Sequence, residues 1–471
     1  LARAVCFLWH FPWGRPRRAL PGTVFPWSPD FPPAPKRQRP SDHLIRHHYW
    51  RLAPAPSRET VTLVAGRRAG HDGGGNSRRF AMHALIDNLA GNHAEMTAIR
   101  RDIHAHPELG FEEHRTSDLV AEKLTDWGIE VTRGIGQTGL VGTLRVGNDP
   151  RSVGLRADMD ALPIVEANTF EHCSRHPGVM HACGHDGHTA MLLGAARYLA
   201  ETRNFEGCVH FIFQPAEEGI GGARAMVNDG LFEKFPCDSI FGMHNRPGMD
   251  IGNFAIRPGA MMAGGALFDI TVTGVGAHGA RPESGVDPVV VASQIVTACQ
   301  TIVSRNISPR DTAVLSFTQI HGGDAYNVIP QSARIMGTAR AFSMAVMGMI
   351  EDNMRRMAES IAAGFGATAE LDFRLEFMPT VNNATETLFA IECARDLVGG
   401  DNVNEEIPLV MASEDFSYML NERPGAYIFV GNGAGEGGCE VHNPGYDFND
   451  QALPFGAAYF VNVVEKKLAR R

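Results

Sequence analysis

The sequence lacks the features that mark a membrane protein or a small disulfide-linked scaffold. It has no run of about 18 consecutive apolar residues, so we expect no segment that spans a membrane. The eight cysteines are scattered over 471 residues, and no two of them form a CxxC pair. This spacing does not indicate a disulfide framework, so we expect a reducing compartment, namely the cytoplasm.

An overall excess of positive charge is also missing. The formal net charge is −10, whereas a nucleic-acid-binding chain typically carries a basic patch. We therefore expect neither a nucleic acid nor a membrane as a partner. The charge is uneven along the chain: residues 1–81 hold 14 Lys and Arg against 4 Asp and Glu, which leaves the remainder with a net charge of −20.

Residues 1–81 lack the hydrophobic periodicity of a packed helix or strand. They contain 11 of the 28 prolines and 4 of the 5 tryptophans, and their Pro-rich runs favour extended, solvated backbone. Helical periodicity begins near Met82. We expect residues 1–81 to be a disordered or non-native extension, and a targeting segment is the alternative.

Helical and strand patterns alternate after Met82, which predicts an α/β fold with helices on both faces of a sheet. In such sheets the reactive residues collect at strand ends and in the loops that follow. The expected helices are 85–105, 114–127 and 189–199, and the expected strands are 138–146, 152–157, 208–213 and 239–243.

A second unit is expected to begin at Gly264 and Gly265. Its elements are strand 267–274, helix 287–305, strands 312–321 and 332–341, helix 344–364 and strand 368–377. This βαββαβ order is that of the ferredoxin-like split motif. We therefore predict an insert at 264–378 within a first domain formed by residues 82–263 and 379–471.

The densest group of chemically active residues is His181-Ala-Cys-Gly-His-Asp-Gly-His188. Cys183 and His185 are two residues apart, so in an extended segment both side chains would point the same way. A thiolate and an imidazole suit Zn²⁺ and similar divalent ions. The alternative is a buried free cysteine beside histidines that cap the next helix.

Two adjacent carboxylates, Glu217 and Glu218, directly follow the buried strand 208–213. Such a pair is costly at a strand end unless cations neutralise it. Because successive side chains diverge, one carboxylate can bind metal while the other accepts a proton from water that the metal has acidified. A solvated loop is the alternative.

Two single histidines complete the candidate ligands. His244 follows the apolar strand 239–243, and His442 follows a glycine-rich loop. Each alone is typical of a hydrogen-bonded structural histidine. Their positions, where a sheet would deliver them to one edge, favour metal binding.

Taken together, these motifs resemble the hippurate hydrolase and auxin–amino acid conjugate hydrolase family of N-acyl-amino acid amidohydrolases, which belongs to the co-catalytic metallopeptidase group. The resemblance runs in order through almost all of Met82–Arg471. The matching stretches are 101–111, Leu155-Arg-Ala-Asp-Met-Asp-Ala-Leu-Pro163, 180–188, Gln214-Pro-Ala-Glu-Glu218, Gly276-Ala-His278, Asn327-Val-Ile-Pro330, Ala412-Ser-Glu-Asp-Phe416 and 442–450.

The resemblance implies a zinc-peptidase-like catalytic domain with a mixed sheet flanked by helices, and an inserted ferredoxin-like dimerisation or lid domain. It also implies two divalent metal ions (Zn, Mn, Ni or Co) bridged by Cys183. Asp160 would orient the metal ligands without binding the metal itself. The remaining ligands would be His185, Glu218, His244 and His442, and Glu217 would be the general base and proton donor.

For the substrate, the resemblance implies that His278, Asn327 and Arg340 hold the scissile carbonyl and the substrate carboxylate. A surface salt bridge is the alternative for Arg340. The insert would pair two subunits in a homodimer or homotetramer, and His278 and Asn327 would then act on the neighbouring active site.

The leading functional hypothesis is metal-dependent hydrolysis of the amide bond of N-acyl amino acids, which releases a carboxylic acid and a free amino acid. A dipeptidase or carboxypeptidase of the same group is the alternative, and a non-catalytic metal-binding homologue is the third. The presence of all five ligand candidates and of Glu217 argues against the third.

Overall fold

The computed structural model describes residues 84–435 and 437–471. The expected extension at 1–81 lies outside the described residues. Within the described ranges, the structure contains no helix that combines the length and the apolar character needed to cross a bilayer.

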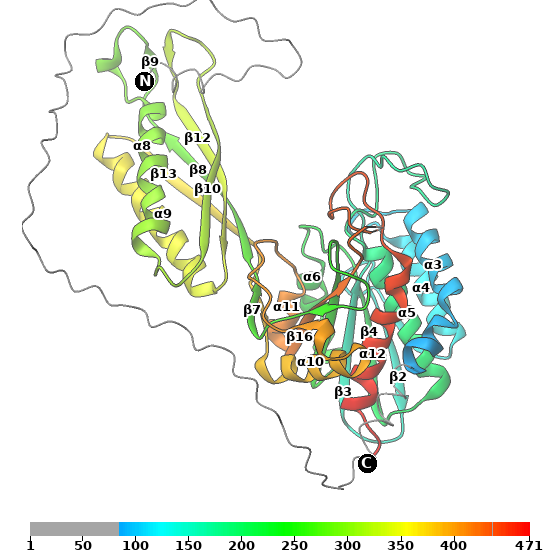
Figure 1. Ribbon diagram of the computed structural model, residues 1–471. Helices are drawn as coiled ribbons and strands as arrows, with labels where there is room; N and C mark the ends of the chain where they lie inside the picture. The colour runs from blue at the N-terminus through cyan, green and yellow to red at the C-terminus, as the bar shows by residue number, and fades with distance from the viewer. Residues whose placement is uncertain (1–83, 436) are drawn as a thin grey trace, which may run out of the picture. The chain divides into compact units, whose positions relative to one another are not determined.

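An eight-stranded mixed sheet forms the centre of the first domain (Figure 1). Its middle strands β4, β3, β5 and β16 are parallel to one another, and the strands toward both margins include antiparallel pairs. In sheet order the strands are β1 (Glu130–Arg133), β2 (Leu140–Val146), β4 (Gly207–Gln214), β3 (Ser152–Asp158), β5 (Ser239–Arg246), β16 (Gly425–Gly431), β6 (Phe254–Ala255) and β15 (Val403–Asn404).

Helices pack on both faces of this sheet, because its strands bury apolar side chains on both sides. In β4, Phe211 and Phe213 belong to one core and Ile212 to the other, as the period of two along a strand requires. One face packs against α3 (His93–Ala105), α4 (His114–Asp126), α5 (His185–Thr202), α10 (Ala384–Val398) and α12 (Leu453–Lys467), and the other against α6 (Gly222–Asn228), α7 (Leu231–Lys234) and α11 (Ser417–Glu422). The predicted α/β fold with a mixed sheet flanked by helices is therefore confirmed.

The segment from Gly264 to Phe377 builds a separate four-stranded antiparallel sheet with its own apolar core. The strand order β10-β12-β8-β13, which is second, third, first and fourth along the chain, is that of the ferredoxin-like motif. The elements are β8 (Gly264–Thr273), α8 (Pro288–Thr301), β10 (Ala313–Gly322), β12 (Ser332–Ala341), α9 (Met344–Gly364) and β13 (Thr368–Phe377). The limits that we predict for the domains, 82–263, 264–378 and 379–471, stay a prediction.

Short elements complete the structure. The strands β7 (Gly259–Met262) and β14 (Thr380–Asn382) pair where the chain enters and leaves the four-stranded segment, and β9 (Ala277–His278) pairs with β11 (Val328–Ile329). The single turns of helix are η2 (Pro282–Ser284), η4 (Gly400–Asn402) and η5 (Asp450–Ala452), and η3 (Ile302–Asn306) is a π-helical turn.

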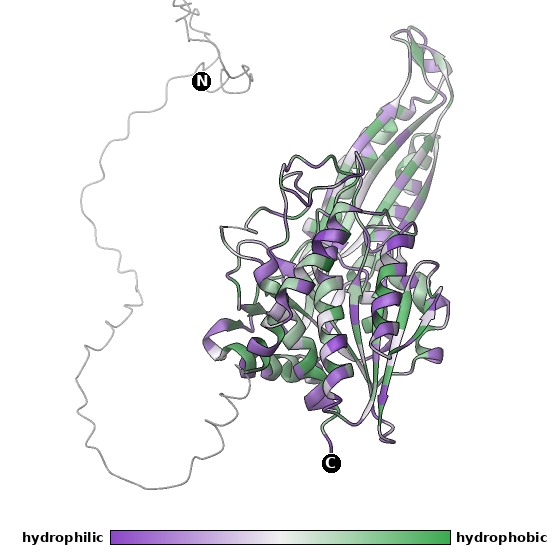
Figure 2. Ribbon diagram, turned by 90° about the vertical axis from the view of Figure 1, so that its right-hand side faces the viewer, coloured by the Kyte–Doolittle hydropathy of each residue, from purple (hydrophilic) through white to green (hydrophobic). Residues whose placement is uncertain are grey.

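Both helices of the four-stranded segment begin at residues whose side chains cap them. Asp287 accepts hydrogen bonds from the backbone of Val289 and Val290 at the start of α8, and Ser343 accepts one from Val346 at the start of α9. Such caps each contribute about 1 kcal/mol. Hydrophobic and hydrophilic residues alternate along the helices in Figure 2, as expected for elements that cover a core with one face.

Several expected boundaries differ from the structure. The expected helix 189–199 extends over His185–Thr202. The expected helix 85–105 is interrupted by a turn at Gly91 and Asn92, where glycine disfavours continuous helix. The expected strand 239–243 continues to Arg246, so His244 lies inside β5 and not after it.

We predict that Ile270→Ala lowers the free energy of unfolding of the four-stranded segment by about 2–5 kcal/mol, because Ile270 is fully buried on β8. Leu267→Ala on the same strand is the matched control. Leu267 is 45% exposed, and a change within about 1 kcal/mol is expected. Urea unfolding curves of both variants measure the difference, and equal losses would contradict the burial argument.

Candidate metal centre

The predicted ligands collect at the edge where the parallel strands of the large sheet end. Strand β3 pairs in parallel with β4 and β5, and β5 pairs in parallel with β16. Their carboxyl ends therefore meet at one edge, where ligands typically bind in open α/β sheets. Asp158 ends β3, the Glu217–Glu218 loop follows β4, and His244 lies near the end of β5.

The five predicted ligands form two groups that share one cysteine. The ligand atoms of Cys183, His185 and His244 lie within 4.8 Å of one another, and so do those of Cys183, Glu218 and His442. Cys183 Sγ lies 3.3 Å from His244 Nε2, and Glu218 Oε1 lies 3.2 Å from His442 Nε2. This arrangement has the donor types of a site for two divalent ions around one thiolate.

The backbone brings Cys183 and His185 together in a way that the spacing did not predict. The segment is not extended: Gly184 has φ +97°, and His185 is the first residue of α5. A side chain at position 184 would collide with Asn245 and Tyr446, so this position requires glycine. The prediction of an extended segment was wrong because the next helix begins inside the motif.

His442 reaches the same edge from a distant part of the sequence. Its backbone N–H donates to the Ala182 carbonyl at 2.7 Å, next to Cys183. Its φ of +64° is uncommon for a residue other than glycine. His442 is the most exposed of the five candidates, with about half of its side chain accessible, 52%.

Asp160 orients two of the ligands. Its Oδ1 lies 3.0 Å from His185 Nδ1, and its Oδ2 accepts the backbone N–H of Glu218 at 2.9 Å. The other ring nitrogen of this imidazole, His185 Nε2, is buried without a hydrogen-bond partner among the described residues. Buried polar atoms rarely stay unpaired, so the donor set fits metal ions.

The electrostatics of the site disfavour the ionised forms of Cys183 and Glu217 in the absence of cations. Burial, followed by the charges of Glu218 and Glu217, raises the pKa of the Cys183 thiol well above its usual range. Burial also raises the pKa of Glu217, and the neighbouring Glu414 and Glu218 add to the effect. Positive charge at this edge would favour the ionised form of both groups.

The pKa values of the two histidines beside Cys183 are shifted in opposite directions. Burial lowers the pKa of His185, but the charge of Asp158 and the contact with Asp160 outweigh it and raise the pKa to about 10. For His244, burial followed by the charge of His188 lowers the pKa well below its usual value. His244 is therefore neutral near pH 7, as a metal-binding imidazole must be, whereas His185 would release a proton on binding.

Glu217 is buried beside these ligands. Its Oε1 accepts the backbone N–H of Asp415 at 3.2 Å, and its carboxylate lies within 4.8 Å of ligand atoms of His185 and Glu218. The adjacent carboxylates thus have different partners, as the divergence of successive side chains predicted.

Two histidines of the 181–188 motif are not in the two groups around Cys183. His188 Nδ1 lies 2.6 Å from Asp158, and its Nε2 accepts the backbone N–H of Asn245 at 2.9 Å. His181 is buried without a hydrogen bond among the described residues.

A buried arginine that the sequence analysis did not single out holds the carboxylates at this edge. Arg156 is fully buried, and its guanidinium donates to Asp158 at 2.7 Å and to Glu414 at 2.8 Å. Glu414 also accepts the hydroxyl hydrogen of Tyr427. The signal available in the sequence was the alternation of Arg156 with Asp158 in an otherwise apolar strand.

Arg340 lies on β12 opposite Gly265, where any side chain larger than hydrogen would collide with its guanidinium. Its Nη1 donates to the hydroxyl of Ser413, next to Glu414. Arg340 is half-buried and makes no salt bridge within residues 84–435 and 437–471. The surface salt bridge considered as an alternative is therefore not formed.

His278 and Asn327 lie together at the β9–β11 pair of the four-stranded segment. The backbone N–H of Gly279 donates to the Asn327 carbonyl at 2.7 Å, and His278 Nδ1 accepts the N–H of Ala280 at 3.0 Å. Both side chains are exposed, and neither belongs to a group of potential metal ligands in the described chain.

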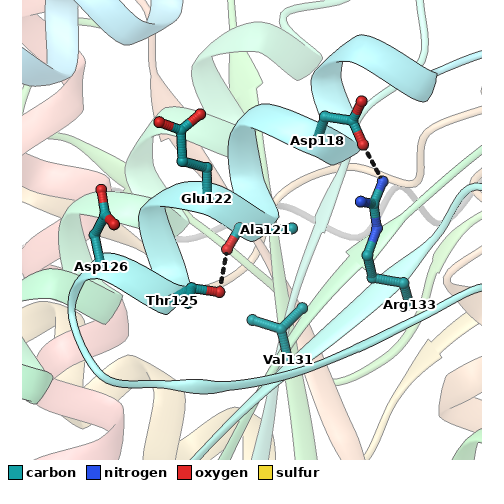
Figure 3. A pocket seen from close by; sticks show the side chains of 7 residues that line it. All are labelled: Asp118, Ala121, Glu122, Thr125, Asp126, Val131 and Arg133. Atoms are coloured by element: carbon teal, nitrogen blue, oxygen red, sulfur yellow. Dashed lines mark hydrogen bonds and ion pairs between the residues drawn. The ribbon is translucent and has the colours of Figure 1, made fainter.

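A surface groove between α4 and β1 contains none of the predicted site residues (Figure 3). Its polar side chains include Asp118, which is paired with Arg133, and the carboxylates Glu122 and Asp126. These carboxylates follow one another at four-residue spacing along a single helix, which is typical of a solvated helix face.

The sequence profile of the peptidase family M20/M25/M40 matches residues 154–466. The chain belongs to this family. It is 42% identical to the hippurate hydrolase of Campylobacter jejuni over 384 residues, which cover 82% of this chain and 99% of that protein. It is 40% identical to the IAA-amino acid hydrolase ILR1-like 5 of Arabidopsis thaliana over 380 residues, covering 79% of this chain and 86% of that protein.

Among solved structures, the fold is similar to that of the Bacillus subtilis YXEP protein, described as a dinuclear metal binding peptidase of the M20 family. The TM-score is 0.72 at 33% identity, with 81% of this chain and 99% of that chain covered. The family resemblance inferred from the motifs is confirmed.

We predict that Cys183→Ala reduces the amount of divalent metal that the protein retains to a small fraction of the wild-type amount, because the thiolate belongs to both ligand groups. Elemental analysis of purified protein after dialysis measures the loss. Cys237→Ala is the matched control, since Cys237 is similarly buried but packs in the apolar core. Wild-type metal retention by Cys183→Ala would exclude Cys183 as a ligand.

Proposed function

We propose that this chain is a metal-dependent amidohydrolase that cleaves the amide bond of N-acyl amino acids and releases a carboxylic acid and a free amino acid. The convergence of Cys183, His185, Glu218, His244 and His442 around the buried Glu217 is the observation that carries the proposal. The similarity to hippurate hydrolase supports the reaction class.

Two divalent cations, Zn²⁺, Mn²⁺, Ni²⁺ or Co²⁺, would polarise the amide carbonyl and acidify water when bound by these five side chains. Glu217 acts as the general base and accepts a proton from the attacking water. It then delivers this proton to the amide nitrogen as the carbon–nitrogen bond breaks. The amino acid leaves with a free amine, and the acyl group leaves as a carboxylic acid.

Arg340 binds the carboxylate of the substrate. Its planar guanidinium can donate two parallel hydrogen bonds to a carboxylate, and it has no acidic partner in the described chain. Its contact with Ser413 connects the guanidinium to the segment 413–415, in which the backbone N–H of Asp415 donates to Glu217.

His278 and Asn327 bind the scissile carbonyl oxygen from a neighbouring subunit. Both side chains are exposed on the β9–β11 pair and lie among residues of their own segment. In this proposal the ferredoxin-like segment pairs two copies of the chain, as a homodimer or homotetramer in the cytoplasm.

The rival activity, hydrolysis of free dipeptides or of C-terminal residues, is distinguished by assay. Purified full-length protein, loaded with each candidate metal, is tested on hippurate, N-acetyl amino acids and free dipeptides. Turnover of acyl amino acids well above that of dipeptides supports the proposal, and the reverse order assigns the rival activity. Full activity after exhaustive chelation would contradict both.

We predict that Glu217→Gln lowers kcat about 10²- to 10⁴-fold, because a carboxamide cannot accept the proton from water. Metal content is expected to stay at the wild-type level, since the ligands are unchanged. Glu233→Gln, which neutralises an exposed carboxylate on α7, is the control and is expected to leave kcat unchanged. Normal turnover by Glu217→Gln would refute the base assignment.

We predict that Arg340→Ala raises KM for hippurate about 10- to 100-fold, because charged hydrogen bonds to the substrate carboxylate are lost. The variant should not change KM for hippuramide, which lacks the carboxylate. The control is Arg334→Ala on the same strand, where the arginine pairs with Asp269. An equal effect on both substrates would count against carboxylate binding.

A further inference from the structure

Glu113 is a buried carboxylate that the proposed reaction does not use. It lies in the turn before α4 and has no solvent-exposed side-chain surface. A buried carboxylate at the start of a helix would ordinarily accept hydrogen bonds from the first backbone N–H groups. Here Glu108 does this, because its two oxygens accept from the backbone of Arg115 and Thr116 at 2.9 and 2.8 Å.

The carboxylate of Glu113 points instead to the loop that carries Glu217 and Glu218. Its Oε1 accepts the backbone N–H of Ala216 at 2.8 Å, across 103 residues of sequence. Its Oε2 accepts the hydroxyl hydrogen of Thr138, which fixes the second oxygen. The carboxyl group thus connects the turn before α4 to the residue that precedes Glu217.

Ala216 has a conformation that needs such support. Its φ is +50°, in the left-handed region, which costs a residue with a Cβ atom about 1–2 kcal/mol. This conformation turns the chain after Pro215, so that Glu217 reaches the N–H of Asp415 while Glu218 reaches His442.

The packing around Ala216 leaves little space for an alternative conformation. The N–H of Gly222 donates to the Ala216 carbonyl at 2.9 Å, and a side chain at 222 would collide with the carbonyl of Pro215. On the other side, a Cβ atom at Gly110 would lie 2.9 Å from Ala216. The backbone of the turn before α4 therefore lies directly against the loop.

We propose that Glu113 is a positioning residue that holds Ala216 in its left-handed conformation and thereby sets the direction of the Glu217 carboxylate. This inference rests on the proposed function only for the role of Glu217. The hydrogen bond to Ala216 does not require a charged Glu113. Burial raises the pKa of Glu113 to about 7, and the protonated form still offers an oxygen to Ala216.

Two substitutions distinguish the effect of the length of the Glu113 side chain from the effect of its charge. Glu113→Gln keeps the side-chain length and the acceptor oxygen, whereas Glu113→Asp keeps the carboxylate but is one methylene shorter. We expect Glu113→Gln to retain kcat within about threefold, because the hydrogen bond persists. We expect Glu113→Asp to lower kcat for hippurate about 10- to 100-fold with KM changed less than about threefold, since small misplacements of a reacting group are costly.

Hydrogen–deuterium exchange provides a readout that does not depend on activity. Exchange in the peptide 214–222 is expected to be faster in Glu113→Asp and unchanged in Glu113→Gln. Glu112→Asp is the matched control, because the neighbouring Glu112 is exposed. We expect this control to match the wild type in kcat, KM and exchange.

Wild-type kcat and exchange in Glu113→Asp would overturn the inference, and so would equal impairment of Glu113→Gln and Glu113→Asp. If Glu113→Asp does not fold, the variant Thr138→Val is measured instead, because it removes the hydrogen bond that Thr138 donates to Glu113. Faster exchange in the peptide 214–222 of this variant supports the inference, and unchanged exchange overturns it. If the wild type hydrolyses no acyl amino acid, the proposed function fails, and the exchange measurement still decides the role of Glu113.

Discussion

The parallel alignment of β3, β4, β5 and β16 is the constraint on which the candidate centre depends. Parallel strands end at one edge of a sheet, so the loops after them meet there whatever their separation in sequence. Asp160, Glu218 and His244 come to this edge from three successive strands, and His442 from the loop after β16. The two ligand groups around Cys183 are a consequence of this geometry.

The same edge concentrates negative charge in a buried place. Asp158, Glu217, Glu414 and Asp415 are all buried. The buried guanidinium of Arg156 donates hydrogen bonds to three of them, Asp158, Glu414 and Asp415. Buried charges are tolerated when they are paired and hydrogen-bonded. Arg156 and the backbone N–H groups neutralise one part of the cluster, and divalent cations at the ligand groups would neutralise the other.

Backbone positions with positive φ recur around the centre. Gly184 has a left-handed conformation between two ligands, Ala216 precedes the candidate base, and His442 is itself a candidate ligand. At Ala216 and His442 this conformation costs free energy and is retained by surrounding contacts, as is typical of functional sites, whereas a glycine at 184 adopts it without that cost. The contacts of Asn245, Glu113 and Ala182 with these segments connect the stability of the fold to the direction of the ligands.

The α/β fold, the ferredoxin-like order of the inserted segment and the family could be inferred from the sequence, because hydrophobic periodicity and short motifs are local properties. The cluster of histidines and one cysteine in His181–His188 and the pair Glu217–Glu218 also identified candidate ligands and the candidate base. Local patterns do not encode which strands become neighbours. Only the tertiary structure therefore decided that Arg156 lies against Glu414, that His188 faces Asp158, and that Glu113 reaches Ala216, since each contact joins residues whose proximity follows from sheet order and packing.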